Sequence, residues 1–360
     1  MTTRNLKLEK KNNHTYNSWS YVIFPRLLIG VIILICAEVF SGASLQVGLW
    51  HPWTWLVTYW LYFAHFFFFT TLAIRTGKTS LGALYLWGVL FGLYESWITK
   101  VIWYGYSGDG IFAMGNIGPY GYSEISMVFM FHPIMSFILP LAVSCVIYPQ
   151  LRRWFPDLAW FTRRSKGAFA FQVYLVFTFA TIIGMNSGGP FNLALNLVVI
   201  FVFIRVLTWL ALSGDSSSYN SSIVVFGNRG FLGLCIYLVL LYGVSYVYLR
   251  PKGLPSVPVQ LLTFVFYAFI IAGLWLHRSR QPQLNIAMEV EKRELRSVKI
   301  LLILALGLGF FFSFFFKTPE LFLLIMVTFL IWTPMGFVLT AVAFLKGVLE
   351  HISGNRHSDY

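Results

Sequence analysis

The chain has 360 residues, of which 58% are hydrophobic, 19% aromatic and only 11% charged. A soluble domain carries about 25% charged residues, and a surface with so few charges would leave large apolar patches in water. The composition therefore excludes a soluble globular domain, a disordered chain and a disulfide scaffold, and it indicates an all-α, polytopic integral membrane protein. The 26 basic residues outnumber the 13 acidic ones and give a net charge of +13, which is compatible with nucleic acid, an acidic partner or a membrane surface.

Ten segments are long and apolar enough to cross a membrane as helices. A helix needs roughly 20 mostly apolar residues to cross the hydrocarbon core. Apolar runs such as Phe66–Phe69 lack the alternation that is typical of a membrane β-strand. The predicted spans are residues 21–42, 51–74, 80–104, 125–148, 168–185, 191–212, 230–249, 258–277, 300–316 and 320–345.

The basic residues predict how these spans are oriented. If the N-terminus is cytoplasmic, 21 of the 26 Lys and Arg residues fall on the inside, three fall outside, and Lys100 and Arg205 lie within spans. This is the distribution that the positive-inside rule predicts. We therefore expect both termini to be cytoplasmic in a cell-membrane protein whose basic loops attract anionic lipid headgroups. No recognition motif favours nucleic acid.

The segments between the spans are short, so we expect a single transmembrane domain over residues 21–345. A basic cytoplasmic tail (1–20) precedes it and a second cytoplasmic tail (346–360) follows it. The Ser-rich loop at 213–229 is a possible internal division between six spans and four. The Gly-rich segment 105–123 either folds back over the bundle or is a flexible connector.

A polar stripe follows the second predicted span. His51, Thr54, Thr58, Tyr62 and His65 recur at intervals of three and four residues, which places them on one helix face. Because such a face is unstable in lipid, we expect it to point into the bundle. His65 is a candidate for proton exchange or relay, and Tyr62 and Thr58 are candidate substrate contacts. The alternative is hydrogen bonding between helices without chemistry.

The third predicted span carries Glu95 near its midpoint and Lys100 farther out. An ionisable side chain at the centre of a lipid-facing helix costs roughly 2.5–3.5 kcal/mol, so Glu95 should face the bundle interior. Gly88 and Gly92 lie on a face of small residues that allows a neighbouring helix to approach closely. We predict that Glu95 exchanges a proton and that Lys100 contacts substrate. The alternative is a structural salt bridge from Glu95 to Lys100 or Arg205.

The fourth predicted span places His132 one turn from Ser136, between Pro133 and Pro140. Each proline removes a backbone hydrogen bond and can kink the helix at that depth. His132 joins Glu95 and His65 as a candidate for proton exchange or relay, and the three can converge because consecutive spans are usually neighbours.

Two histidines and a glutamate are competent metal ligands, but no two of these residues form an i, i+4 pair on one helix. The spacing therefore does not predict a metal site, and no haem-attachment motif is present. The sequence identifies no cofactor.

Three further polar residues are candidate substrate contacts. Asn192 and Asn196 lie one turn apart on the sixth predicted span, and Arg205 lies deeper in the same span. Arg205 either pairs with Glu95 or extends to the inner surface. Glu38, near the outer end of the first span, is expected to reach water at the outer leaflet.

Three functions fit this pattern. Ionisable groups near the midplane of a ten-helix bundle favour a transporter or permease for a proton, an ion or a small polar solute. A second hypothesis is a membrane enzyme that acts on a lipid-linked or isoprenoid substrate at the outer leaflet, beneath the Gly-rich segment. The third is a non-catalytic subunit of a membrane complex, because aromatic side chains can pack against pigments, quinones or partner helices.

Overall fold

A computed structural model describes residues 20–105, 114–161, 165–212, 223–283 and 292–355. Within these ranges ten helices are long and apolar enough to cross a membrane, which confirms the predicted number of spans and the all-α class. The predicted tail 1–20 lies almost entirely outside the described residues, as do Asp109 and most of the Ser-rich loop.

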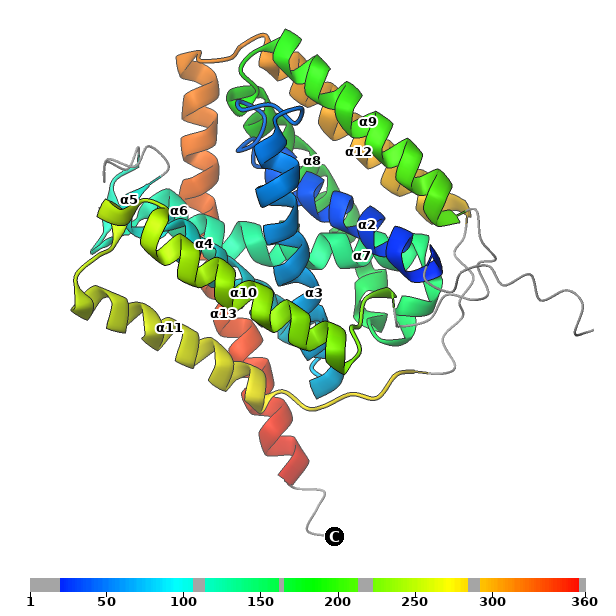
Figure 1. Ribbon diagram of the computed structural model, residues 1–360, viewed down its shortest axis with the longest axis vertical. Helices are drawn as coiled ribbons and strands as arrows, with labels where there is room; N and C mark the ends of the chain where they lie inside the picture. The colour runs from blue at the N-terminus through cyan, green and yellow to red at the C-terminus, as the bar shows by residue number, and fades with distance from the viewer. Residues whose placement is uncertain (1–19, 106–113, 162–164, 213–222, 284–291, 356–360) are drawn as a thin grey trace, which may run out of the picture.

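The chain is helical almost throughout, with one two-stranded hairpin (Figure 1). Labels beginning with η mark π-helical or 3-10 segments. The elements are α2 (Ser20–Leu34), η1 (Ile35–Val39), η2 (Thr54–Thr58), α3 (Tyr59–Thr76), α4 (Leu81–Thr99), α5 (Val101–Tyr104), β1 (Asn116–Ile117), β2 (Tyr120–Gly121), α6 (Tyr122–Ser126), η3 (Met127–Ile138), α7 (Leu139–Ile147), η4 (Pro149–Arg153), η5 (Pro156–Phe161), α8 (Lys166–Asn186), α9 (Pro190–Leu212), α10 (Asn228–Tyr248), η8 (Pro251–Gly253), α11 (Val257–Leu276), α12 (Lys292–Ser313) and α13 (Pro319–Asn355).

The connections between the long helices gather at two ends of the bundle. At the end where α13 terminates, which we call the C-terminal end, Arg26 donates to the Val225 carbonyl at 3.0 Å, and the backbone of Arg280 donates to Gly77 at 2.8 Å. At the other end, which we call the opposite end, the Asn196 side chain binds the backbone of Leu49 at 2.6 Å. The chain therefore alternates between two ends, as ten consecutive crossings require.

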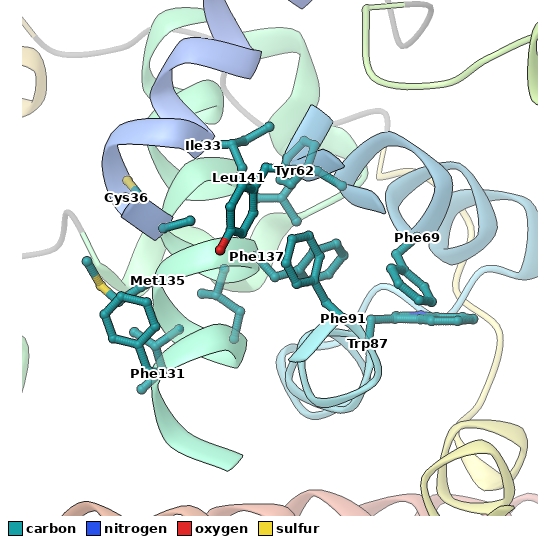
Figure 2. Packing of buried hydrophobic residues seen from close by; sticks show 14 of the residues in the cluster. Ile33, Cys36, Tyr62, Phe69, Trp87, Phe91, Phe131, Met135, Phe137 and Leu141 are labelled. Carbon is teal, nitrogen blue, oxygen red and sulfur yellow. The ribbon is translucent and has the colours of Figure 1, made fainter. Parts of the chain in front are cut away.

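The first four long helices form the core of the bundle. Between 67 and 83% of their membrane-spanning windows is buried, against 11 to 28% for the last five. Figure 2 shows aromatic core side chains, among them Tyr62, Phe91 and Phe137, packed between α3, α4 and the η3–α7 helix. The last five helices, including the adjacent pair α9 and α12 (Figure 1), expose many apolar side chains. Such faces fit contact with lipid.

The last helix is longer than a membrane is thick. α13 has 37 residues and continues to Asn355, past the predicted end of the span at residue 345. At 1.5 Å per residue it is about 55 Å long, whereas the hydrocarbon core measures about 30 Å. Most of the predicted C-terminal tail is therefore helix.

Candidate functional site

A carboxylate and an imidazole meet inside the core. The Glu95 Oε2 atom on α4 lies 3.4 Å from the Nε2 atom of His132 on η3, and their side chains are 11% and 3% exposed. The other imidazole nitrogen of His132, Nδ1, shares a 2.9 Å hydrogen bond with the Ser136 hydroxyl one turn along the helix. Glu95 thus pairs with His132, and neither Lys100 nor Arg205 forms the salt bridge considered from the sequence.

A second carboxylate lies close to this pair. Glu38 is buried in the π-helical segment η1, where it accepts hydrogen bonds from the hydroxyls of Ser44, at 2.6 Å, and Tyr62. It is within electrostatic range of both Glu95 and His132. The expectation that Glu38 reaches outer-leaflet water is wrong, because the chain after η1 folds back and covers it.

His65 contributes to the same region from α3. Its Nδ1 atom hydrogen-bonds the Leu61 carbonyl at 2.7 Å, and its Nε2 atom lies 3.3 Å from the Tyr242 hydroxyl of α10. The Phe91 ring packs against both His65 and His132. The three predicted residues therefore gather in one region, but only Glu95 and His132 are in direct polar contact.

Small residues and a π-helical turn bring the two partners together. An added Cβ at Gly88 would lie 2.4 Å from the Cα of Pro133, and one at Gly92 would lie 3.0 Å from the Cβ of His132. The backbones of α4 and η3 can approach this closely only because these positions lack side chains. Pro133 lies inside η3, in keeping with the lost hydrogen bond expected there, and π-helical turns occur frequently at functional sites.

Lys100 lies away from the pair, at the opposite end of the bundle. It ends α4 in a left-handed backbone conformation, with φ of 57°. Its ammonium donates to the carbonyls of Ser245 and Tyr246, at 3.2 and 2.9 Å, and to that of Leu249. These groups form the carbonyl end of α10, where a cation is favoured by the helix dipole. Its contacts are those of a helix cap, and its predicted contact with substrate stays a prediction.

The asparagines on α9 hold the segment that covers Glu38. Asn192 donates to the Leu45 carbonyl at 2.7 Å, and Asn196 binds both Leu45 and the Leu49 amide. Arg205 is exposed on the surface of α9, and Glu95 forms its ion pair with His132 instead. Thr58 is half-buried, in contrast to the fully buried Tyr62 and His65 farther along the stripe.

A large cavity opens at the opposite end of the bundle. Its volume is about 640 Å³, and its lining includes Glu124 and Met127 from the α6–η3 helix and Arg250 from the segment after α10. Phe131, which precedes His132 in the chain, also lines the cavity. So does Ser41, which lies three residues after Glu38. We call this space the Glu124 cavity.

A second cavity is smaller and almost entirely apolar. It measures about 170 Å³ and lies between α2–η1, the η3–α7 helix, α8 and α12. Cys36 and Phe40, on either side of Glu38, line it together with Met135, the neighbour of Ser136. Both cavities thus border the helices that carry the buried polar residues.

A carboxylate and an imidazole in contact are the distinctive chemical feature of the buried residues. In the ranges that the structure describes, no three His, Cys, Asp or Glu residues are grouped closely enough to hold a metal ion. A carboxylate beside an imidazole in a low-dielectric interior can hold one proton between them or release it when the local charge changes.

The helices, their apolar outer faces and the buried ionisable residues define a multi-pass membrane protein. A model of a family described as an uncharacterized membrane protein family matches residues 27–352, and the chain belongs to that family. An uncharacterized protein from Archaeoglobus fulgidus is 28% identical over 257 residues, which cover 71% of this chain and 79% of the relative. No solved structure matches the chain.

Sequence reasoning missed two carboxylates. Glu38 lies four residues from the predicted end of its span, so its depth alone indicated solvent. The signal that it is covered is the polar pair Asn192 and Asn196, which bind residues 45–49. Glu124 directly precedes the fourth predicted span, and its position in a cavity depends on helices distant in sequence.

Proposed function

We propose that this protein is a proton-coupled transporter of a small solute, in which Glu95 and His132 exchange the coupling proton. The observation that carries the proposal is the 3.4 Å contact between these two side chains in the core of a membrane bundle. Buried ionisable residues are expensive in a membrane and usually mark an ion or substrate pathway.

The surroundings of the pair support a change in protonation. Glu38 is within electrostatic range of Glu95 and His132, so the cluster contains two carboxylates and one imidazole. Adding a proton to His132 would balance one carboxylate, and a proton on Glu38 or Glu95 would relieve the repulsion between the two acids. The cluster has no unpaired buried charge when it holds two protons, and releasing one of them leaves a single net negative charge in the core.

The Glu124 cavity supports the proposal by giving access from the opposite end of the bundle. Its lining includes Phe131, which is adjacent to His132 along the helix. At the C-terminal end, Arg280 pairs with Asp157 at 2.9 Å, and Asp157 also accepts from the Leu81 amide at 3.0 Å. A cavity at one end and ion-paired loops at the other resemble one state of an alternating-access cycle. By the positive-inside rule the cavity would open to the outside.

The test measures proton movement in proteoliposomes that contain a pH-sensitive dye. A panel of amines, amino acids, sugars and carboxylates is added in turn across an imposed pH gradient. We expect at least one solute to move protons through the wild type, and Glu95→Gln to abolish that movement because glutamine cannot release a proton. Equal proton movement in Glu95→Gln, or none with any solute, would overturn the proposal.

Glu320→Gln is the matched control for this experiment. Glu320 is exposed at the start of α13, so its replacement removes the same charge without touching the cluster. It should transport like the wild type. His132→Gln should behave like Glu95→Gln if the two residues act as a pair.

The apolar cavity favours one second candidate, an enzyme acting on a lipid-linked or isoprenoid substrate. Its lining of Cys36, Phe40 and Met135 fits a hydrocarbon chain whose polar end would approach Glu38 or His132. Mass spectrometry of lipids that copurify with the protein tests this candidate. Enrichment of a polyprenyl or lipid-linked species over bulk lipid, with turnover lost in His132→Gln, would favour it over transport.

A further inference from the structure

Glu124 is a buried acid that lacks a cationic partner in the part of the chain that the structure describes. It lies in the first turn of α6 and is only 4% exposed, yet it lines the Glu124 cavity. Its carboxylate accepts one side-chain hydrogen bond, from the Ser123 hydroxyl at 2.8 Å. No described Lys, Arg or His forms an ion pair with it. A carboxylate buried in this way is stabilised by a cation that enters the cavity.

The rest of the lining suits an apolar body. Met127, Met185 and Met326 contribute flexible, polarizable side chains, and Phe131 and Phe329 contribute aromatic rings. Methionines adapt to ligands of different shape, and aromatic rings attract cations as well as apolar groups. A volume of about 640 Å³ is within the range of small-molecule sites.

The charge of Arg250, which also lines the cavity, faces a helix end. Its Nη1 atom donates to the Thr99 carbonyl at 2.9 Å, at the C-terminus of α4. A guanidinium is well matched with the negative end of a helix dipole. Its presence in the same lining disfavours a ligand with two positive charges, whereas a single positive charge beside Glu124 is compatible with it.

We infer that the Glu124 cavity binds an organic monocation with an apolar body, of the arylalkylammonium kind, and that Glu124 holds its charged group. The inference rests on the proposed function only for the role of this cation as the transported solute. Binding itself requires no transport.

The position of the site also relates it to the proton-exchanging pair. Glu124, Met127 and Phe131 follow one another at intervals of three and four residues, so they line one face of the same continuous helix. His132 is the next residue along that helix. A cation bound at Glu124 therefore lies on the same continuous helix as His132.

Equilibrium binding to the full chain in lipid nanodiscs tests the inference. Phenethylammonium and its neutral analogue 2-phenylethanol are titrated by calorimetry, with empty nanodiscs subtracted. We expect the wild type to bind phenethylammonium at least about tenfold more tightly than the alcohol, because the hydroxyl can still donate to Glu124 but lacks the positive charge that pairs with the carboxylate. Glu124→Gln should remove that preference, and Glu124→Asp should retain part of it.

Two control variants separate this inference from the proposed function. Glu320→Gln, which removes an exposed carboxylate near the same end, should bind like the wild type. Glu95→Gln should still bind phenethylammonium even though it no longer moves protons. Equal affinity for the amine and the alcohol, or an unchanged preference in Glu124→Gln, would overturn the inference and leave the proton-coupling proposal standing. If the amine binds with the expected preference but no solute moves protons, the inference about the Glu124 cavity stands and the proton-coupling proposal is overturned.

Discussion

His65 and His132 contact the same phenyl ring from different helices. The centroid of Phe91 lies 5.7 Å from the His65 ring and 6.0 Å from the His132 ring. Of the two imidazoles, only that of His132 lies within ion-pair distance of the Glu95 carboxylate, at 3.4 Å. The two histidines should therefore differ in how strongly they couple to Glu95.

We predict this difference for double-mutant cycles measured by thermal unfolding in detergent. The cycle of Glu95→Gln with His132→Gln should give a coupling energy of roughly 0.5–3 kcal/mol, as expected for residues in direct contact. The cycle of Glu95→Gln with His65→Gln should give a smaller coupling energy, because those side chains interact electrostatically without direct contact. Equal coupling in both cycles would contradict the geometry.

The close approach of α4 to η3 predicts a large effect of a single methyl group. In Gly88→Ala the new Cβ would lie 2.4 Å from the Pro133 Cα, which is backbone and cannot rotate away. Overpacking of this kind costs about 1–3 kcal/mol. In the control Gly233→Ala, on α10, the new Cβ meets nothing within 4 Å. Thermal unfolding should show a loss for the first variant and none for the second.

Lys100 is expected to stabilise the end of α10. Lys100→Met removes the donors from three carbonyl groups and should cost about 1–3 kcal/mol, the scale for hydrogen bonds to a charged group. Hydrogen exchange of the amides around residues 245–249 should become faster, and Lys100→Arg should restore part of the protection. If Lys100→Met instead weakened solute binding and left exchange unchanged, a substrate contact would be the better description.

Two ion pairs at the C-terminal end should differ in how much they stabilise the folded protein, because their side chains differ in exposure. The Arg152–Glu294 side chains are 10% and 18% exposed, whereas the Arg280–Asp157 side chains are both 32% exposed. Removing one partner of a buried pair costs about 3–5 kcal/mol, and an exposed pair is worth about 0–1 kcal/mol. Arg152→Ala should therefore lower the unfolding temperature far more than Arg280→Ala. Similar shifts would show that burial does not decide the difference.

Hydropathy and loop charge predicted the ten crossings because both depend on composition over long windows. They could not predict which helices lie in the core and which face lipid, since hydropathy does not follow burial: the buried first span is as apolar as the exposed α9. The inward direction of Tyr62 and His65 followed from helical spacing, but the same stripe also contains His51, which is exposed at its outer end.

The candidate site was predictable only in part. Glu95 and His132 stood out because charged and imidazole side chains at membrane depth are expensive. Their partner Glu38 did not, because a covering segment lowers its exposure and a sequence window cannot show that segment. The partners of Lys100 were not predictable for the same reason, since they are carbonyl groups of a helix almost 150 residues later.

Glu38 and His132 both lie in π-helical segments, where each turn contains one residue more than in an α-helix. If η3 lost one residue while its π-helical winding was kept, one half of the helix would turn against the other. The face bearing Glu124 and Phe131 would no longer be aligned with the half that continues as α7 and lines the apolar cavity. The spacing within this helix is thus fixed to the single residue, so that in this family substitutions should be tolerated along η3 where insertions and deletions are not.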